Sequence, residues 1–295
     1  IDGVEEFVAK MNNAELMVAV GADIMSLAIL KSPGSFGADV VFGSTQRFGV
    51  PMGYGGPHAA YFSTKESFKR HIPGRIIGVS MDADENIALR MALQTREQHI
   101  KRARATSNIC TAQALLAVMA SMYVVYHGPD GLKAIANHIH SLASKTASEL
   151  RKAGVSVSEN QFFDTVHVTG VDTKAIKENA EHAEMNFRIV NASELTVSFG
   201  EPHTIADVSL VVAVITGNEI TIENTIETSL TDARRTDAIL THPTFNNFHS
   251  ESKMMRYLKR LENKDLSLVH SMIPLGSCTM KLNAASELLA ISNPQ

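Results

Sequence analysis

The segment FGSTQRFGVPMGYGGPHAAYF, residues 42–62, decides the fold, because it joins an apolar strand to a polar turn and then to a glycine-rich loop. Four glycines and two prolines lie between positions 49 and 57, and glycine lets backbone N–H groups come close to an anion. The same residues are compatible with a tight surface turn, which composition alone favours. No lysine stands between Asp39 and Lys65.

Short apolar runs alternate with turn signals over the first hundred residues. Strands are expected at 16–20, 39–42, 58–63 and 75–80, with a basic helical turn over 65–71 between the last two. Short strands joined by helical connections predict an α/β sheet. The strands are too few for a complete large sheet, so a preceding portion of the protein is expected to be missing.

Two long helices are expected next. The first begins at Ser107, whose hydroxyl can cap a helix N-terminus, and its apolar girdle up to Val125 predicts burial on most sides. The second starts at Asp130, carries an apolar stripe at spacings of three and four, and ends at Gly154. Strands near 165–168 and 195–198, around a helix capped by Asp172, then predict a small α/β domain.

Composition excludes several classes of protein. The 295 residues are 44% hydrophobic and 20% charged, as in an ordinary globular chain, and the net charge of -4 argues against nucleic acid as a general partner. No apolar run is long enough to predict a membrane span. Cys110 and Cys278 do not form a disulfide framework, which favours a reducing compartment, and a regulatory pairing of the two has little support. Both ends look like cuts, so a fragment is expected.

Four long motifs, in family order, resemble the glycine decarboxylase P-protein family of the glycine cleavage system. They are STQRFGVPMGYGGPHAAYF at 44–62, ALQTREQHIKRARATSNICTAQALLAVMA at 92–120, HSESKMMRYLKRLENKDLSLVH at 249–270 and MIPLGSCTMKLNAASE at 272–287. The resemblance covers nearly the whole chain. It implies two homologous halves, each like a fold-type I pyridoxal phosphate (PLP) enzyme.

The resemblance also implies a division of the chain. Residues 1–105 are expected to be the remainder of a partial PLP-transferase-like large domain of the α/β class. Residues 106–240 are expected to hold the linking helices and the small C-terminal α/β domain. Residues 241–295 are expected to be a helical linker and the start of the catalytic half.

A PLP site requires a lysine for the Schiff base and an acid against the pyridinium nitrogen. Aligning on the phenylalanine and proline of the loop puts Gln46 at the lysine position, and aligning on the upstream Gly-Ala-Asp puts Arg47 there. Neither side chain is a nucleophilic amine. The position of the acid falls at Val20. By resemblance the cofactor lysine lies beyond Gln295, so no catalytic residue is expected in this chain.

Two segments hold the candidate binding residues. Arg96 and Arg102 belong to the densest basic run, which is either a solvated helix face or a place where the two halves meet and bind a phosphate, a carboxylate or an acidic carrier protein. The residues expected to bind the cofactor are Thr106, Ser107, Asn108 and Thr111 at a helix start, and Ser277, Cys278 and Thr279 in the GSCTMK loop. Simple helix capping and a buried thiol are the competing interpretations. The histidines have no metal-ligand spacing, so no metal is expected.

The resemblance implies glycine dehydrogenase activity. An intact enzyme would decarboxylate glycine with PLP and pass the aminomethyl group to the lipoyl arm of an H-protein. The chain is expected to be the non-catalytic half, with its second half or a complementary subunit as partner in a homodimer or heterotetramer. The alternatives are a scaffold module that docks the catalytic half and the H-protein, and a stand-alone PLP enzyme using Lys31, Lys65 or Lys281. The cytoplasm is expected for a bacterial source, and the mitochondrion for a eukaryotic one.

Overall fold

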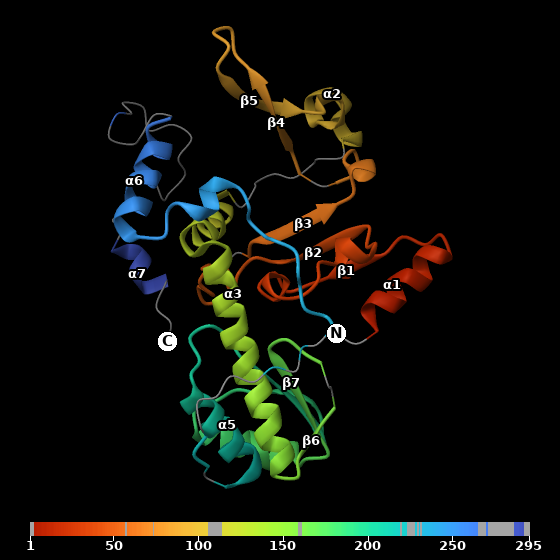
Figure 1. Cartoon of the computed structure of the whole chain (residues 1–295), viewed down its shortest axis with the longest axis vertical. Coiled ribbons are helices and arrows are strands. Elements are labelled where there is room, and N and C mark those ends of the chain that lie inside the picture. Colours follow the sequence, from red (N-terminus) through yellow and green to blue (C-terminus); the bar gives the residue numbers. More distant parts are fainter. Residues whose placement is uncertain are drawn as a thin grey trace. The chain divides into compact units, whose positions relative to one another are not determined.

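The computed structural model of the chain describes residues 3–56, 58–72, 74–105, 114–158, 161–218, 220–222, 232–264 and 286–291, with residues 228, 230 and 270. The chain divides into two compact units (Figure 1). Unit 1 consists of Ile1–Lys10, Asp23–Ser32 and Val124–Asp265, and unit 2 consists of Met11–Ala22, Pro33–Tyr123 and Leu266–Gln295. The three-part division made from the sequence stays a prediction.

A three-stranded sheet of order β1-β2-β3 organises unit 2. Strand β1 (Ala19–Gly21) runs parallel to β2 (Val40–Ser44), and β2 pairs antiparallel with β3 (Ala60–Thr64). The turns η1 (Ser26–Ala28) and η2 (Pro33–Phe36) lie in the connection from β1 to β2. The predicted strands at 39–42 and 58–63 are therefore confirmed, with bounds shifted by one or two residues.

A β-hairpin follows in unit 2. Strand β4 (Ile76–Met81) pairs antiparallel with β5 (Ile87–Ala92), and the turn between them is closed by Asp82, whose Oδ1 accepts hydrogen bonds from two backbone N–H groups. The strand predicted at 75–80 is confirmed, but the sequence analysis missed β5. Short helical elements then cover the basic run: η4 (Gln94–Arg96), α2 (Gln98–Lys101) and η5 (Arg102–Arg104). The predicted basic turn is η3 (Glu66–Phe68).

The long helix α3 (Ala114–Lys152) has a break inside it. Gly128 has φ 62° and ψ -172°, and Pro129 follows. The two predicted helices correspond to the segments on either side of this break, although the predicted start at Ser107 lies outside the described residues. The prediction that the first segment is buried on most sides is wrong, since Leu115 and Val118 are more than half exposed. Apolar composition produces burial only where a partner surface is present.

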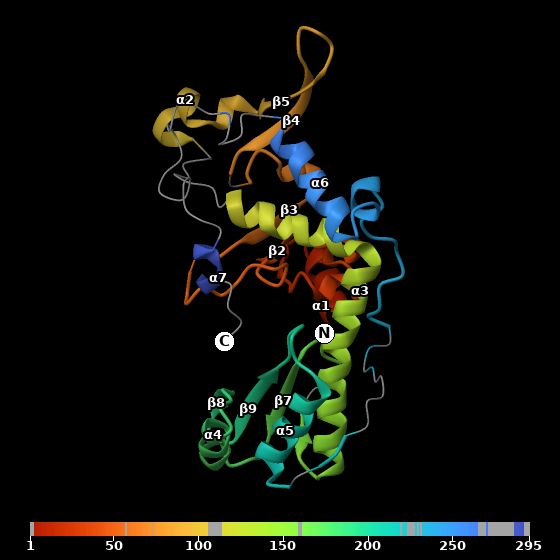
Figure 2. The same cartoon turned by 90° about the vertical axis from the view of Figure 1, so that its left-hand side faces the viewer.

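Unit 1 contains a second, antiparallel sheet of order β6-β7-β9-β8. Its strands are β6 (Ser156–Val157), β7 (Thr165–Thr169), β8 (Arg188–Asn191) and β9 (Glu194–Ser198), with helices α4 (Thr173–His182) and α5 (Ile205–Thr216). Val166 and Leu195 of the sheet, Val208 of α5 and Leu150 of α3 are fully buried. Figure 2 shows α3 and α5 alongside this sheet. The small α/β domain is confirmed, and so is the Asp172 cap of α4.

The remaining helices are α1 (Val4–Asn13), η6 (Pro243–Asn246), α6 (Glu251–Glu262) and α7 (Glu287–Ile291). Before α6, Phe248 stacks on Tyr257 of that helix with ring centroids 4.2 Å apart. Within the part of the chain that the structure describes, no helix is long and apolar enough to cross a membrane.

The segment before α6 docks on the break in α3. The break leaves backbone carbonyls of the preceding helical turn without N–H donors, because the helix is interrupted and Pro129 has no N–H. His249 supplies a replacement: its ring Nδ1–H donates to the carbonyl of Tyr126 at 2.7 Å. A Cβ built on Gly128 would lie 2.4 Å from Cε1 of His249 and 2.7 Å from the carbonyl oxygen of Phe245. Glycine at 128 is therefore required by both its backbone conformation and its neighbours.

Replacing Gly128 by alanine is expected to lower the free energy of unfolding by about 2 kcal/mol or more, since it combines a strained backbone with a steric clash. Gly154→Ala is the matched control: Gly154 also has a positive φ, of 82°, but nothing lies within 4 Å of its built Cβ. The control is expected to cost only about 1 kcal/mol. Urea denaturation followed by circular dichroism measures both, and equal losses would contradict the docking of His249.

Candidate functional site

The turn after β2 is the position at which the sequence analysis looked for a lysine. The backbone N–H of Thr45 donates to the carbonyl of Ala59 at 2.9 Å, and that of Phe48 donates to the carbonyl of Thr45 at 2.9 Å. The hydroxyl of Ser44 accepts from the N–H of Gln46 at 3.1 Å. Gln46 and Arg47 are therefore the half-buried side chains of one well-bonded helical turn.

The glycine-rich loop is anchored to the start of α3 within unit 2. Phe48 is buried and stacks on Tyr123 with ring centroids 5.7 Å apart and an interplanar angle of 15°. Gly49 follows with φ 74°, and a Cβ there would lie 2.9 Å from Cδ2 of Tyr123. This glycine is needed both for its backbone conformation and for the close approach of the ring.

The residues at the end of β2 do not fit covalently held PLP. Gln46 and Arg47 offer no nucleophilic amine, and Val20 is an apolar residue paired with Val41 in the sheet. The first carboxylate after β1 along the chain belongs to Asp23, and its Oδ1 accepts from the N–H of Ser26 at 2.9 Å. That carboxylate supports a local turn. These residues offer no amine for a Schiff base, and the expectation that the chain is a non-catalytic portion stays a prediction.

Two of the lysines considered for a stand-alone PLP enzyme are engaged in ion pairs. Nζ of Lys65 lies 2.7 Å from Oδ1 of Asp39, and Nζ of Lys31 lies 3.1 Å from Oε2 of Glu5. The hydrogen bond from Lys65, together with one from the N–H of Val18, lowers the pKa of Asp39 below its ordinary value. The third lysine, Lys281, lies outside the described residues.

None of the predicted cofactor-binding residues belongs to the part of the chain that the structure describes. Thr106, Ser107, Asn108, Thr111, Ser277, Cys278 and Thr279 all lie outside the described residues, as does Cys110. Their roles stay predictions. Among the described residues, no group of three or more His, Cys, Asp or Glu side chains could hold a metal ion.

Arg96 and Arg102 occupy different environments. Arg96 is only 3% exposed, and its guanidinium donates to the backbone carbonyls of Lys69 at 3.2 Å, Ile72 at 2.8 Å and Gly74. It closes the loop between η3 and β4. Its predicted anion-binding role stays a prediction, and the observed contacts are structural. The sequence analysis missed this function because a basic run does not reveal which of its members points inward.

Arg102 remains the better candidate of the pair for binding an anion. It is exposed, and its backbone has φ 55° and ψ -127°, a conformation uncommon for a residue other than glycine. Strained backbone of this kind concentrates at functional positions. Its place in the basic run, shortly before the predicted ligand residues at 106–111, is consistent with the prediction.

Glu97, beside Arg96, is a buried carboxylate of unit 2. It is 2% exposed, and its oxygens lie 3.7 Å from Nε of Arg96 and 3.8 Å from Nε of Arg75. Both distances are longer than a hydrogen bond, and among the described residues Oε1 of Glu97 and Nε of Arg96 have no hydrogen-bond partner, so these contacts are ion pairs only. The three side chains together brace the base of the β4–β5 hairpin.

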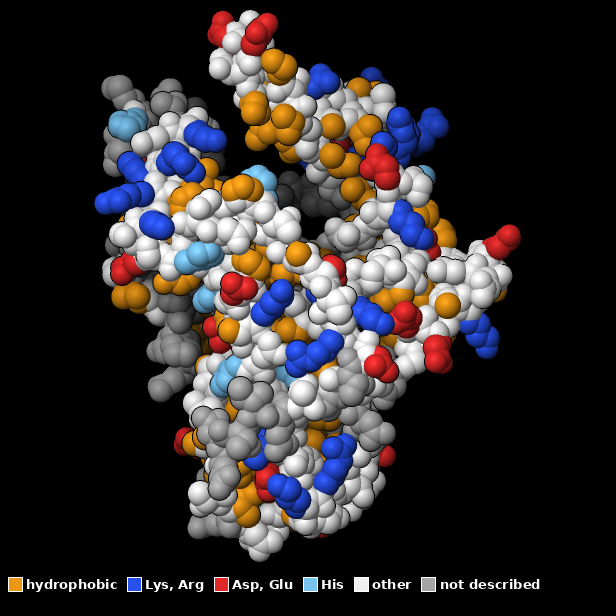
Figure 3. Space-filling view, viewed as in Figure 1, with side chains coloured by type: hydrophobic (Ala, Val, Ile, Leu, Met, Phe, Trp, Pro, Cys, Tyr) orange, Lys and Arg blue, Asp and Glu red, His pale blue; other side chains and the backbone are white. Residues whose placement is uncertain are grey.

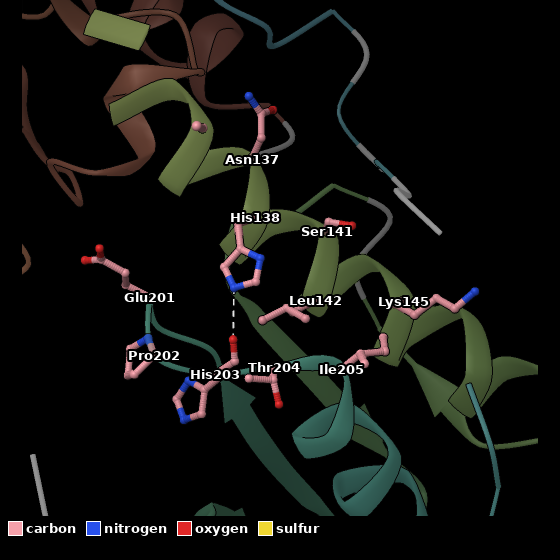
Figure 4. Close-up of a pocket in the computed structure, with 11 residues that line it drawn as sticks. Asn137, His138, Ser141, Leu142, Lys145, Glu201, Pro202, His203, Thr204 and Ile205 are labelled. Carbon is pink, nitrogen blue, oxygen red and sulfur yellow. Dashed lines mark hydrogen bonds between the residues drawn. The ribbon is translucent and has the colours of Figure 1, made fainter. Parts of the chain in front are cut away.

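The described histidines of unit 1 bond mainly to the backbone. A pocket of about 660 Å³ lies between α3 and the loop before α5, and His138 lines it (Figure 4). Nε2–H of His138 donates to the carbonyl of His203 at 2.9 Å, and Nδ1 of His203 accepts from the N–H of Gly200 at 2.8 Å. These contacts hold the loop against the helix. Of the residues predicted to form a site, the two that the structure describes, Arg96 and Arg102, do not line this pocket.

His140, one helical turn before Ser144, is a buried neutral imidazole. Its Nδ1–H donates to the carbonyl of Phe163 at 2.8 Å, so Nε2 accepts from the hydroxyls of Thr228 at 3.0 Å and Ser144 at 3.2 Å. Burial lowers the pKa of His140, and the positive charge of Arg234 lowers it further. The residue therefore serves the core of unit 1 and offers no acid or base to a ligand.

Removing the Arg96 guanidinium is expected to destabilise the fold. Arg96→Ala leaves three backbone carbonyls without their donor and Glu97 without its nearer positive charge, which should lower the free energy of unfolding by about 3 kcal/mol. Arg102→Ala, the matched control on the same run, should leave stability within about 0.5 kcal/mol. Urea denaturation tests both variants, and an unaffected Arg96→Ala variant would refute the bracing role.

The chain alone is expected not to hold PLP on a defined lysine. After incubation with one equivalent of PLP and reduction with borohydride, peptide mass mapping should find no stoichiometric adduct at a single site. The physical reason is the absence of an amine at the turn after β2. Lys65→Arg and Lys31→Arg are the control variants: a single-site adduct that one of them abolishes would show that the chain binds the cofactor by itself.

Comparison with known proteins places this geometry in a family. A family model described as "Glycine cleavage system P-protein" matches residues 1–215. Glycine dehydrogenase (decarboxylating) of Flavobacterium johnsoniae is 57% identical over 297 residues, which cover 98% of this chain and 31% of the relative. The mitochondrial glycine dehydrogenase (decarboxylating) of Pisum sativum is 51% identical over 299 residues, which cover 98% of this chain and 28% of the relative.

The solved structures agree. A crystal structure of glycine decarboxylase (P-protein) of the glycine cleavage system, in inhibitor-bound form, matches with a TM-score of 0.67 and 30% identity, over 72% of this chain and 51% of that chain. The predicted α/β fold class is confirmed. The chain spans about a third of the length of the curated relatives described above. The chain belongs to the glycine cleavage system P-protein family.

Proposed function

We propose that the chain is the lysine-lacking, non-catalytic portion of a glycine dehydrogenase (decarboxylating), and that a complementary portion of the enzyme holds PLP. The observation that carries this proposal is the turn after β2, where Gln46 and Arg47 stand in a P-protein framework without an amine. The framework around them is well packed, since Phe48 stacks on Tyr123 and Gly49 allows the close approach of that ring.

In the complementary portion, bound PLP would supply the electron sink that lets the carboxyl group of glycine leave as CO₂. The aminomethyl group would then pass to the lipoyl arm of an H-protein. The proposed partners of this chain are accordingly glycine, the H-protein and its second half or a complementary subunit, in a homodimer or heterotetramer. For a bacterial source the proposed compartment is the cytoplasm.

The contribution of this chain would be positioning. Arg102 is exposed in the basic run and bears an always-protonated, planar guanidinium, which suits a phosphate or carboxylate. The hydroxyl-bearing residues Thr106, Ser107 and Thr111 would reach the same anion from the start of the following helix. In this arrangement the silent portion completes the pocket of its partner and takes no part in bond breaking.

The test is a grafted protein in which this chain replaces the 297 residues of the Flavobacterium johnsoniae relative that it matches. With PLP, H-protein and glycine, the grafted protein is expected to exchange labelled bicarbonate into the carboxyl group of glycine, whereas this chain alone should not. The relative itself, prepared in the same way, is the positive control.

Two results would contradict the proposal. One is exchange activity in this chain alone. The other is a grafted protein that folds, as judged by circular dichroism and a cooperative unfolding transition, yet shows no exchange. A grafted protein whose cofactor lysine in the complementary portion is replaced by alanine should lose the exchange, which ties the activity to that portion.

A further inference from the structure

One face of the β4–β5 hairpin in unit 2 is apolar and exposed. In the register of the hairpin Ile77 lies opposite Met91, Val79 opposite Leu89 and Met81 opposite Ile87, so all six side chains share one face. Five of them are exposed: Ile77 by 56%, Val79 by 76%, Met81 by 64%, Ile87 by 81% and Leu89 by 72%. Figure 3 shows apolar side chains gathered on this hairpin.

The opposite face of the hairpin is different in kind. Apart from Ile76 it carries small or polar residues, namely Gly78, Ser80, Ala88, Arg90 and Ala92, and all of its side chains except Arg90 are half-buried. Most of the large apolar side chains of the hairpin are thus turned toward solvent, the reverse of the usual arrangement in a half-buried sheet. Contiguous apolar surface of this kind marks an interaction site.

The contacts within such a hairpin contribute little to its stability. Two strands alone are marginally stable in water and need a further strand or a packed surface. The base of this hairpin is held by the buried pair Arg96 and Glu97, but its outer part ends in an acidic turn with Asp82, Asp84 and Glu85. A partner is therefore expected to present an apolar centre, with a basic group beside the turn.

Resting on the proposed function, we infer that this apolar face is the docking surface for the cofactor-bearing portion of a P-protein, one of the segments that lie outside the span of this chain. The curated relatives extend to about three times the matched length, so most of their polypeptide is available to cover it. Half of the similar solved P-protein chain also lies outside the match.

Chain continuity favours this occupant over a second copy of the chain. Strand β5 leads within a few residues to the basic run that contains Arg102, and then to the segment 106–111 that is predicted to reach the cofactor phosphate. A hairpin docked on the cofactor-bearing portion would deliver that segment to its ligand. A hairpin docked on another lysine-lacking chain would deliver it to a silent site.

The test compares the isolated chain with the grafted protein defined above. Hydrogen–deuterium exchange of the backbone amides at 76–92 is expected to be at least about tenfold slower in the grafted protein. Val79→Asp and Leu89→Asp each place a charge at the centre of the face. In the grafted protein, each substitution should return the amide hydrogen–deuterium exchange rate to that of the isolated chain. Each should also lower the rate of the glycine–bicarbonate reaction about tenfold. Ser80→Asp is the matched control, with the same added charge on the same strand and the opposite face.

Each outcome separates the two proposals. If Val79→Asp and Leu89→Asp leave the amide exchange and the activity of the grafted protein unchanged, the assignment of this face as a docking surface is wrong, whereas the proposed function stands. If the unsubstituted grafted protein folds but is inactive while the hairpin is still protected, the proposed function fails and the docking surface stands. If light scattering shows that the isolated chain is a dimer that Val79→Asp dissociates, the occupant is a second copy and the inference is overturned.

Discussion

The stack of Phe48 on Tyr123 is the contact on which the interpretation of unit 2 depends. Aromatic pairs of this kind contribute about 0.5–1.5 kcal/mol beyond the area they bury. Here the pair also fixes the turn after β2 against the first part of α3, because the ring of Tyr123 approaches Gly49 so closely that no side chain fits there. Gln46 and Arg47 are held in that same turn. Shifting the loop would therefore disturb this contact, and the turn itself contains no amine side chain.

A pair of buried charges has a structural role in unit 2. The Arg96 guanidinium closes a loop by bonding three backbone carbonyls, and Glu97 balances it in the same buried place. Buried charges are tolerated only when they are paired or fully bonded, so this cluster ties the hairpin firmly to unit 2. Arg102, six residues later, remains in solvent. One short basic run thus contains both a buried structural arginine and an exposed one.

Much of the fold is predictable from sequence, and the failures have physical causes. The strands at 39–42, 58–63 and 75–80 follow from apolar and β-branched runs between turn residues, and the α4 cap follows from Asp172. Strand β5 is missed because IALRMA at 87–92 is rich in helix-forming residues, and pairing with β4 overrides that propensity. The lack of an amine in the turn after β2 can be read from the sequence, and its meaning for function stays a prediction. The inward direction of the Arg96 side chain cannot be read from the sequence, because no periodicity encodes it.

The dependence of β5 on pairing with β4 also links folding of the hairpin to binding of a partner. Because β5 has the local propensity of a helix, its strand form depends on cross-strand pairs such as Val79 with Leu89, and these pairs are open to solvent on one face. A partner that covers the apolar face would stabilise the cross-strand pairs. In turn, ordered pairs would hold the apolar face in the form that the partner binds. The two equilibria are linked, so a partner that binds only the ordered hairpin stabilises it by mass action. Folding of this hairpin and docking of a complementary portion would then be one thermodynamic process, which would account for an apolar surface that this chain by itself leaves exposed.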